Sequence, residues 1–392
     1  MAETMGPLQS IDVPGVKLAD DEARHLRQDV QRLLGRERWD FPGAQPVSFA
    51  RHHLKELRSK DYYVCEKSDG IRYLLYLTIH PTTGDEAHFM IDRRNDYWYV
   101  TSGSTHIPTT KAENTFHQGT LLDGELVMDD IGNGRKEPTY LVFDCLALDG
   151  QNLMSRELPK RLGYFKEWIY NPYKALYKKY PEEKQYQSFF LGMKEMQVAY
   201  GIEMMFREVI KNLKHGNDGL IFTCLGSEYK PGTDPHILKW KAADENTVDF
   251  RWKLEWPTIQ PDEEDIAEGW TEPYKHYHEI PQIQMFAYHG GNGPDSYRPF
   301  AEMYMTEEEW EELKALNEPL NDRIIEAYMD EQKRWRFYRF RDDKPNGNHI
   351  SVIKSVLDSI EDGVTKEELL AAAKGIRDAW KERQQAQSQR RG

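Results

Sequence analysis

The sequence predicts an α+β protein of two domains, with antiparallel sheets and flanking helices followed by a small β-barrel. Three observations support this prediction. The chain has 392 residues, and at about 150 residues per domain this length suggests two or three domains. Short runs rich in β-forming residues fill 61–148, and segments with apolar residues at helical spacing stand on either side. A second group of strands begins near residue 247, after a boundary expected just behind Lys241.

The composition excludes several classes of protein. With 10 Trp, 22 Tyr and 15 Phe the chain can bury a sizeable core, which excludes wholesale disorder. It carries 52 Lys and Arg against 66 Asp and Glu, a net charge of −14, so any nucleic acid must bind at a local basic patch. No apolar run approaches the roughly 18 residues that span a bilayer, and the opening MAETMGPLQS lacks the features of a secretory signal. We therefore expect a soluble, intracellular protein.

The three cysteines are widely spaced and odd in number. Cys65, Cys145 and Cys224 each lie in an apolar run, and no CxxC spacing occurs. This pattern argues against a zinc site or a disulfide framework, and it is typical of small residues buried in strands.

Two periodicities predict the elements of the first domain. Apolar residues at helical spacing over 21–34, with Asp20 or Asp21 as a cap and Gly35 as a stop signal, predict the first helix. Further helices are expected at 160–180 and 188–214. Strands are expected where β-rich runs are bounded by turn residues, at 61–66, 73–79, 88–92, 97–100, 120–128, 139–148, 219–224 and 237–241.

The second domain is expected to be the small β-barrel with an inserted helix. Apolar residues alternate over 247–256, which predicts a half-buried strand. An acidic, proline-containing loop is expected at 257–273, and a helix opens at Thr306 with Glu309 completing a capping box. The remaining elements are strands at 283–288, 323–328 and 334–341 and a last helix capped at 365–368.

The most informative lysine is Lys67, in the run KSDGIR between two predicted strands. Gly70 lets the backbone bend sharply, so a lysine in this turn can project into a cleft and serve as a nucleophilic amine. The KxDG pattern alone is weak evidence, because most lysines in turns are simply solvated.

Five further motifs place charged residues within predicted strands or at their ends. They are Asp123-Gly124-Glu125, Phe143-Asp144, Asp218-Gly219, the pair Lys239 and Lys241, and the group Arg341, Asp343 and Lys344. Period-two spacing puts Lys239 and Lys241 on one face of their strand. Taken singly, the charged residues of each motif are better explained as solvent-exposed side chains on one face of a strand, with no role in catalysis or binding.

Taken in order, the motifs KxDGxR, DGE, the aromatic strand, DGxxF, KxK and RxDK resemble the covalent nucleotidyltransferase superfamily. This superfamily includes mRNA capping enzymes and ATP-dependent polynucleotide ligases, and six separated matches rarely co-occur by chance. Within it the chain is similar to fungal mRNA guanylyltransferases along most of its length, notably at FPGAQPVS (41–48), LPKRLG (158–163) and DKPNGNH (343–349). The resemblance implies a nucleotidyltransferase domain at 1–244, an OB-fold domain with an inserted helix at 245–362, and a C-terminal helix with a polar tail at 363–392.

The resemblance also implies the reaction. Lys67 attacks the α-phosphorus of GTP, releases pyrophosphate and carries GMP until the 5′-diphosphate end of RNA accepts it, which forms the GpppN cap. The implied catalytic residues are Lys67, Asp69, Arg72, Lys239, Lys241, Arg341, Asp343 and Lys344. The implied nucleotide contacts are Ser68, Arg72, Glu125, Phe143, Lys194, Lys239, Lys241, Arg341 and Lys344. Asp218 and Glu125 are the expected ligands of Mg²⁺ or Mn²⁺, because hard cations prefer carboxylate oxygens.

The resemblance further implies partners and a location. The partners are 5′-diphosphate RNA, a separate RNA 5′-triphosphatase subunit and the phosphorylated C-terminal domain of RNA polymerase II; the location is the nucleus, with no membrane contact. Two alternatives stay open. An ATP-dependent polynucleotide ligase would share Lys67, Asp69 and Arg72, and the segments 41–48 and 343–349 favour the capping reaction over it. A non-catalytic binding module would keep the same fold, but every charged motif position is intact.

Overall fold

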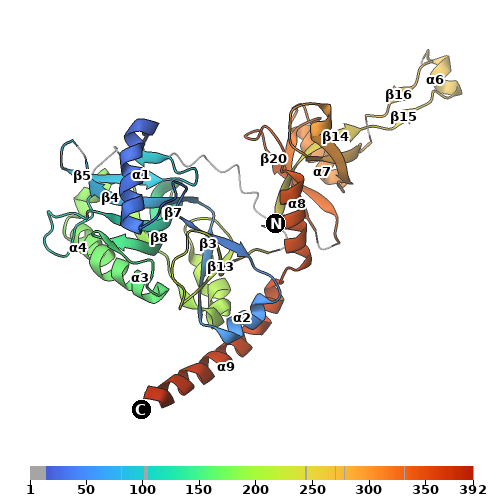
Figure 1. The fold of residues 1–392 in the computed structure, drawn as a ribbon. Coiled ribbons are helices and arrows are strands. Elements are labelled where there is room, and N and C mark those ends of the chain that lie inside the picture. The colour runs from blue at the N-terminus through green and yellow to red at the C-terminus, as the bar shows by residue number, and fades with distance from the viewer. Residues whose placement is uncertain are drawn as a thin grey trace. The chain divides into compact units, whose positions relative to one another are not determined.

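Two compact units make up the chain in a computed structural model (Figure 1). The structure describes residues 15–391 except 81, 101–104, 243–244, 270, 278 and 331. The first unit contains the chain up to Trp240 and again from Glu367, and the second unit is Lys241–Lys366.

An eight-stranded sheet forms the larger part of the first unit, in the order β1-β6-β5-β4-β7-β8-β10 with β9 paired to β8. The strands are β1 (Val16–Lys17), β4 (Ile71–Ile79), β5 (Glu86–Ile91), β6 (Tyr97–Tyr99), β7 (Thr120–Gly132), β8 (Arg135–Leu148), β9 (Gln151–Asn152) and β10 (Phe190–Met193). All pairs are antiparallel except β8 with β10. The five strands predicted between 73 and 148 are confirmed in this sheet.

A five-stranded sheet contains the other strands of the first unit, in the order β11-β3-β12-β13-β2. The strands are β2 (Ala44–Ser48), β3 (Tyr62–Ser68), β11 (Gln197–Val198), β12 (Asn217–Cys224) and β13 (Gly232–Trp240). Two predicted boundaries are wrong by a residue or two. Lys67 and Ser68 belong to β3 rather than to the turn, because Ser68 still pairs with Asn217. Strand β13 ends at Trp240, so Lys241 lies beyond it.

The first predicted helix is confirmed as α1 (Asp20–Leu34), which buries Ala23, Leu26, Val30 and Leu34. It ends at Gly35, whose φ of +63° suits a residue without a side chain. Its cap differs from the prediction. The N-cap is Ala19, whose N–H donates to the Glu22 carboxylate over 3.1 Å, and the two aspartates lie inside the first turn. Acidic residues there are favoured by the helix dipole.

The helix predicted at 160–180 is confirmed as α3 (Leu158–Phe165), a wider turn η1 (Lys166–Tyr170) and α4 (Asn171–Lys179). The helix predicted at 188–214 is wrong in its first half. That half forms β10 and β11, and the helical turns η3, α5, η4 and η5 occupy only Ala199–Asn212. Pairing with β8 and β3 satisfies the backbone polar groups of these strands, and such tertiary pairing overrides local helix preference.

The C-terminal helix α9 (Lys366–Arg391) packs against the first unit, next to α2 (His53–Ser59) in Figure 1. Arg383 Nη2 donates to Asp61 Oδ1 over 2.6 Å, and the rings of Trp380 and Tyr200 lie 5.3 Å apart. The chain therefore leaves the first unit at Trp240 and returns to it at Glu367.

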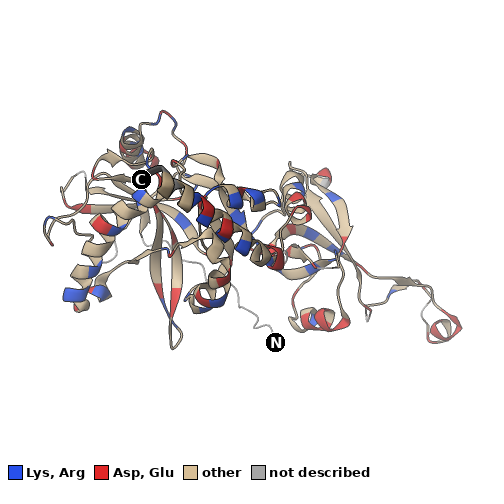
Figure 2. Cartoon of the chain, turned by 90° about the horizontal axis from the view of Figure 1, so that it is seen from below, with Lys and Arg blue, Asp and Glu red and all other residues tan. Residues whose placement is uncertain are grey.

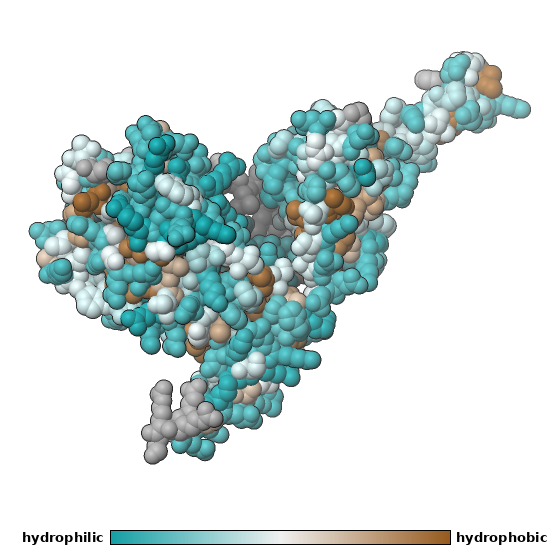
Figure 3. Space-filling view, viewed as in Figure 1, coloured by the Kyte–Doolittle hydropathy of each residue, from teal (hydrophilic) through white to brown (hydrophobic). Residues whose placement is uncertain are grey.

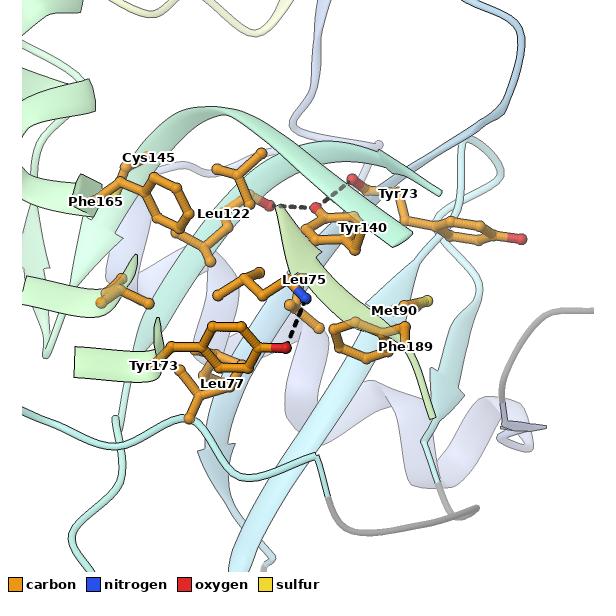
Figure 4. Packing of buried hydrophobic residues seen from close by; sticks show 14 of the residues in the cluster. Tyr73, Leu75, Leu77, Met90, Leu122, Tyr140, Cys145, Phe165, Tyr173 and Phe189 are labelled. Atoms are coloured by element: carbon orange, nitrogen blue, oxygen red, sulfur yellow. Dashed lines mark hydrogen bonds between the residues drawn. The ribbon is translucent and has the colours of Figure 1, made fainter. Parts of the chain in front are cut away.

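Tyr140 lies in the core between the eight-stranded sheet and the helices α3 and α4 (Figure 4). Its hydroxyl bonds to the carbonyl oxygens of Tyr73 and Leu122 over 2.9 and 3.2 Å. Gly124 on β7 faces this ring. A Cβ atom at Gly124 would stand 2.6 Å from Cζ of Tyr140 and 2.8 Å from the carbonyl oxygen of Leu141. The glycine of the DGE motif is therefore required by close packing.

Gly124→Ala is expected to lower the free energy of unfolding by about 1–3 kcal/mol, because the added methyl overpacks the core. Thermal unfolding would measure the change. Gly163→Ala is the matched control, since nothing lies within 4 Å of a Cβ at that helical position. Alanine there favours the helix, so stability should be unchanged or higher. A Gly124→Ala variant as stable as the wild type would contradict this packing argument.

The second unit is built on a five-stranded sheet in the order β18-β17-β14-β19-β20. Its strands are β14 (Thr247–Glu255), β17 (Gln282–Tyr288), β18 (Tyr297–Glu302), β19 (Ile324–Met329) and β20 (Trp335–Phe340). The expected closed barrel is not formed by ladders among the described residues. The edge strands meet through one isolated parallel bridge between Met303 and Trp335, where the N–H of Tyr304 donates to the Trp335 carbonyl over 2.9 Å.

The acidic stretch predicted as a loop contains short elements. Strands β15 (Thr258–Ile259) and β16 (Tyr274–Lys275) pair, with α6 (Glu263–Ala267) between them. The capping box at Thr306 is confirmed by α7 (Glu307–Ala315), while α8 (Ile350–Glu361) was not expected. Both α6 and α7 are rich in Asp and Glu, and these residues are red on the ribbon in Figure 2.

The surface in Figure 3 is mainly hydrophilic, with hydrophobic residues in small groups. In the part of the chain that the structure describes, every helix is too short or too polar to cross a membrane.

Candidate active site

Lys67 lies at the end of β3, beside the start of β12. Its Nζ donates to Asp218 Oδ1 over 2.5 Å, and both side chains are partly exposed. The pairing of β3 and β12 shifts register between Asn217 and Leu220, where Gly219 adopts a φ of +140°. Such a bulge redirects side chains at a strand end. The two motifs KxDG and DG, far apart in the sequence, thus present an amine and a carboxylate to each other.

The turn after Lys67 is held from both sides. The N–H of Asp69 donates to the carbonyl of Gly216 over 2.9 Å, which ties the turn to the loop before β12. A Cβ at Gly70 would lie 2.5 Å from the carbonyl oxygen of Leu126. Only glycine allows this close approach of the turn to β7, the strand that carries Glu125.

Arg72 forms a buried ion pair rather than an open cationic contact. Its Nε and Nη2 donate to the two carboxylate oxygens of Asp123 over 2.9 and 2.6 Å, and Nη1 donates to the carbonyl of Ala44. The hydroxyl of Tyr229 donates to the same carboxylate over 2.6 Å. Burial raises the pKa of Asp123, and Arg72 and Tyr229 oppose that rise. Arg72 therefore positions β4 against β7, and its contact with the nucleotide stays a prediction.

Four predicted nucleotide contacts come together around the buried side chain of Lys194. Its Nζ donates to Ser68 Oγ over 2.6 Å and lies 3.7 Å from Glu125 Oε2. The same ammonium lies 5.9 Å from the ring centroid of Phe143, and the guanidinium of Arg72 lies 5.5 Å from it. Burial raises the pKa of Glu125, and the charges of Lys194 and Lys67 oppose the rise. An aromatic face flanked by cations, a hydroxyl and a carboxylate suits a nucleoside.

Lys239 lies on the same sheet face as Lys67. Lys239 on β13 pairs with Ile221 on β12, and Ile221 pairs with Cys65 on β3, so these three residues share one face of the sheet. Lys67 lies two residues after Cys65 on β3 and therefore points to the same face. Lys241 follows β13 and belongs to the second unit. The prediction that both lysines project from one strand face is therefore wrong for Lys241.

The remaining predicted cations form a cluster inside the second unit. Arg341 Nη1 lies 3.1 Å from Asp249 Oδ1, and its Nε lies 2.9 Å from Asp343 Oδ1. Lys344 Nζ lies 3.3 Å from Asp249 Oδ2. Asp343, one of the catalytic residues that the resemblance implied, contacts Arg341, whereas Asp249, which contacts both Arg341 and Lys344, was not predicted.

The predicted metal ligands fit a partial coordination shell. Within the described residues there is no group of three or more His, Cys, Asp or Glu side chains arranged to hold a metal. Mg²⁺ commonly takes one or two carboxylates and completes its shell with water and substrate phosphates. Asp218 at the Lys67 amine fits that pattern together with Glu125, because the negative charge of Asp218 is close enough to help raise the pKa of Glu125.

Sequence reasoning missed the partners that hold the site. Asp123 and Tyr229 fix Arg72, Glu66 lies beside Lys194, and His215 lies beside Glu66. Asp123 carried a signal, because a carboxylate in the middle of an apolar strand must find a partner when it is buried. Tyr229 and His215 lie in loops with no comparable pattern.

Two family models match nearly the whole chain. The model "mRNA capping enzyme, catalytic domain" matches residues 8–243, and "mRNA capping enzyme, C-terminal domain" matches residues 245–370. The chain belongs to the mRNA capping enzyme family. Its sequence is 52% identical to that of the mRNA-capping enzyme subunit alpha of Neurospora crassa, and the alignment covers 98% of this chain and 96% of the Neurospora protein.

Two other capping enzymes extend the comparison. The mRNA-capping enzyme subunit alpha of Schizosaccharomyces pombe is 46% identical over 97% of this chain and 91% of its own. The mRNA-capping enzyme of Mus musculus is 31% identical over 92% of this chain but only 55% of its own. Among solved structures, a mycobacterial DNA ligase D complexed with ATP and MES has 17% identity and a TM-score of 0.36, covering 77% of this chain and 94% of that one.

Proposed function

We propose that this chain is an mRNA guanylyltransferase, which transfers GMP from GTP through a lysyl intermediate to the 5′-diphosphate end of nascent mRNA. The observation that carries the proposal is the contact of Lys67 with Asp218, in a chain that belongs to the capping enzyme family. The family membership disfavours the ligase alternative and the non-catalytic alternative.

The first step forms a bond between Nζ of Lys67 and the α-phosphorus of GTP. The bond from that phosphorus to the bridging oxygen breaks, and pyrophosphate leaves with the electron pair. Lys67 must lose its proton to attack, and Asp218 Oδ1 is the acceptor at 2.5 Å. In the second step, an oxygen of the RNA β-phosphate attacks the same phosphorus, the bond from phosphorus to Nζ breaks, and the Lys67 amine leaves as it takes back a proton from Asp218. Lys239 on the shared sheet face is placed to balance the phosphate charge.

We also propose a divalent cation, Mg²⁺ or Mn²⁺, at Asp218 and Glu125. When bound it would supply positive charge to the phosphates. The relatives' names contain "subunit alpha", which supports a partner subunit for this chain. We propose that this partner is an RNA 5′-triphosphatase, that the phosphorylated tail of RNA polymerase II recruits the enzyme, and that it resides in the nucleus.

Label transfer tests the proposed function. The full chain is incubated with α-³²P GTP or α-³²P ATP and a divalent cation, without RNA, and resolved on a denaturing gel. We expect acid-labile label on the protein from GTP and not from ATP, followed by its transfer to 5′-diphosphate RNA. Label from ATP alone would support a ligase, and no label from either nucleotide would contradict the proposed enzyme.

A further inference from the structure

Next to Lys67 in the sequence, Glu66 belongs to a buried cluster of charged side chains that also contains Lys194 and His215. The proposed mechanism gives no role to Glu66 or His215. Lys194 lies between two carboxylates, 3.6 Å from Glu66 Oε1 and 3.7 Å from Glu125 Oε2. Both distances exceed that of a direct hydrogen bond, whereas the bond from Lys194 to Ser68 is 2.6 Å. One ammonium is thus shared by two acids.

His215 supplies the second positive charge of this cluster. Its Nδ1 lies 2.7 Å from Asp129 Oδ1, and Asp129 accepts a further hydrogen bond from the hydroxyl of Thr139 over 2.7 Å. Its Nε2 points to Glu66, 3.8 Å from Oε1, and has no hydrogen-bond partner among the described residues. The imidazole is therefore fixed by Asp129 and directed at Glu66.

The ionisation of the cluster agrees with this geometry. Burial lowers the pKa of His215, but the hydrogen bond with Asp129 and the negative charges of Asp129 and Glu66 raise it to about 9. Burial would raise the pKa of Glu66, but His215 and Lys194 lower it below its usual range. At pH 7 a charged imidazolium therefore faces a charged carboxylate.

The surroundings leave room for the cluster to rearrange. A cleft of about 380 Å³ is lined by Glu66, Lys194 and His215. Apolar residues such as Met193 and Met204 form other parts of its wall. The backbone at His215 is held on both sides. The N–H of Asp130 donates to the carbonyl oxygen of Lys214 over 2.6 Å, and the N–H of Asp69 donates to the carbonyl oxygen of Gly216 over 2.9 Å. The loop that carries His215 is therefore held in place next to the cleft.

We propose that His215 is a positioning residue for Lys194: its charge balances Glu66, which keeps Lys194 shared with Glu125 and bonded to Ser68. Without that charge, Glu66 would draw Lys194 away from Glu125 and Phe143, because a buried carboxylate must be paired. The inference rests on the proposed function, since Lys194 and Ser68 matter to the reaction as contacts of GTP.

His215→Gln removes the charge and keeps a side chain that can bond to Asp129. We expect KM for GTP in enzyme–GMP formation to rise about tenfold, with the rate at saturating GTP within about twofold, as for a loss of binding. His215→Lys keeps the charge and should stay within about threefold of the wild-type KM. His236→Gln is the matched control, because His236 also lies 3.8 Å from a glutamate, Glu56, in the same unit.

The decisive measurement is Glu66→Gln in the His215→Gln background. Charge balance predicts a lower KM for GTP in the double variant than in His215→Gln, because the unpaired carboxylate is gone. A double variant with an equal or higher KM, or a His215→Lys variant as impaired as His215→Gln, would overturn the proposal. A wild-type chain that forms no enzyme–GMP would overturn the proposed function instead. Circular dichroism checks each fold, and His215→Lys decides the question where His215→Gln does not fold.

Discussion

Lys67→Arg is expected to reduce enzyme–GMP formation by at least about 1,000-fold while the chain stays folded. Arginine keeps the positive charge and can keep the ion pair with Asp218, but it stays protonated in proteins and offers no lone pair to phosphorus. The measurement is label transfer from α-³²P GTP, with the initial rate read from a denaturing gel.

The matched control for this prediction is Lys60→Arg. Lys60 is a lysine of the same unit in contact with a carboxylate, 2.8 Å from Glu56 Oε1, and it lies outside the site. We expect its labelling rate to equal that of the wild type. Label on the Lys67→Arg protein at the wild-type rate would show that another lysine carries GMP, with Lys239 the first to test.

Asp123→Asn is expected to lower the free energy of unfolding by about 3–5 kcal/mol. Asp123 is fully buried and holds Arg72 through both oxygens, so the neutral amide leaves a buried guanidinium without its counter-charge. The hydroxyl of Tyr229 also loses its charged acceptor. Urea denaturation would measure the shift.

A surface ion pair provides the control for Asp123→Asn. Lys179 and Glu113 pair over 2.9 Å, with more than half of each side chain exposed, so Lys179→Ala should leave the free energy of unfolding nearly unchanged. If both variants were destabilised equally, the prediction that the buried Arg72–Asp123 pair contributes more to stability than the exposed pair would be refuted. A double variant, Arg72→Gln with Asp123→Asn, should be more stable than Asp123→Asn alone, since no charge is left unpaired.

Local patterns predicted most elements correctly where each element buries one face. The alternation over 247–256 became β14, and the helical spacing over 21–34 became α1. These predictions succeed because burial of one face imposes a period of two on a strand and of 3.6 on a helix. The prediction at 188–214 failed because β10 and β11 complete sheets whose other strands lie far away in the sequence.

The candidate site was foreseen in its residues but not in its pairs. Family resemblance named Lys67, Asp218, Glu125 and Lys194, and the structure brings them together at the ends of β3 and β12. The family resemblance could not show that the Arg72 guanidinium pairs with Asp123. Nor could it reveal His215 as the partner of Glu66, because no periodicity links residues about 150 positions apart.

The sequence by itself determined the family, the order of the charged motifs and the elements that carry them, since these depend on residues close together in the chain. Tertiary structure alone decided which charges meet. Lys67 finds Asp218 because β3 pairs with β12, and Lys194 lies between Glu66 and Glu125 because β10 pairs with β8. Strand pairing joins distant segments through backbone hydrogen bonds, and a buried charge is stable only next to the partner that this pairing supplies.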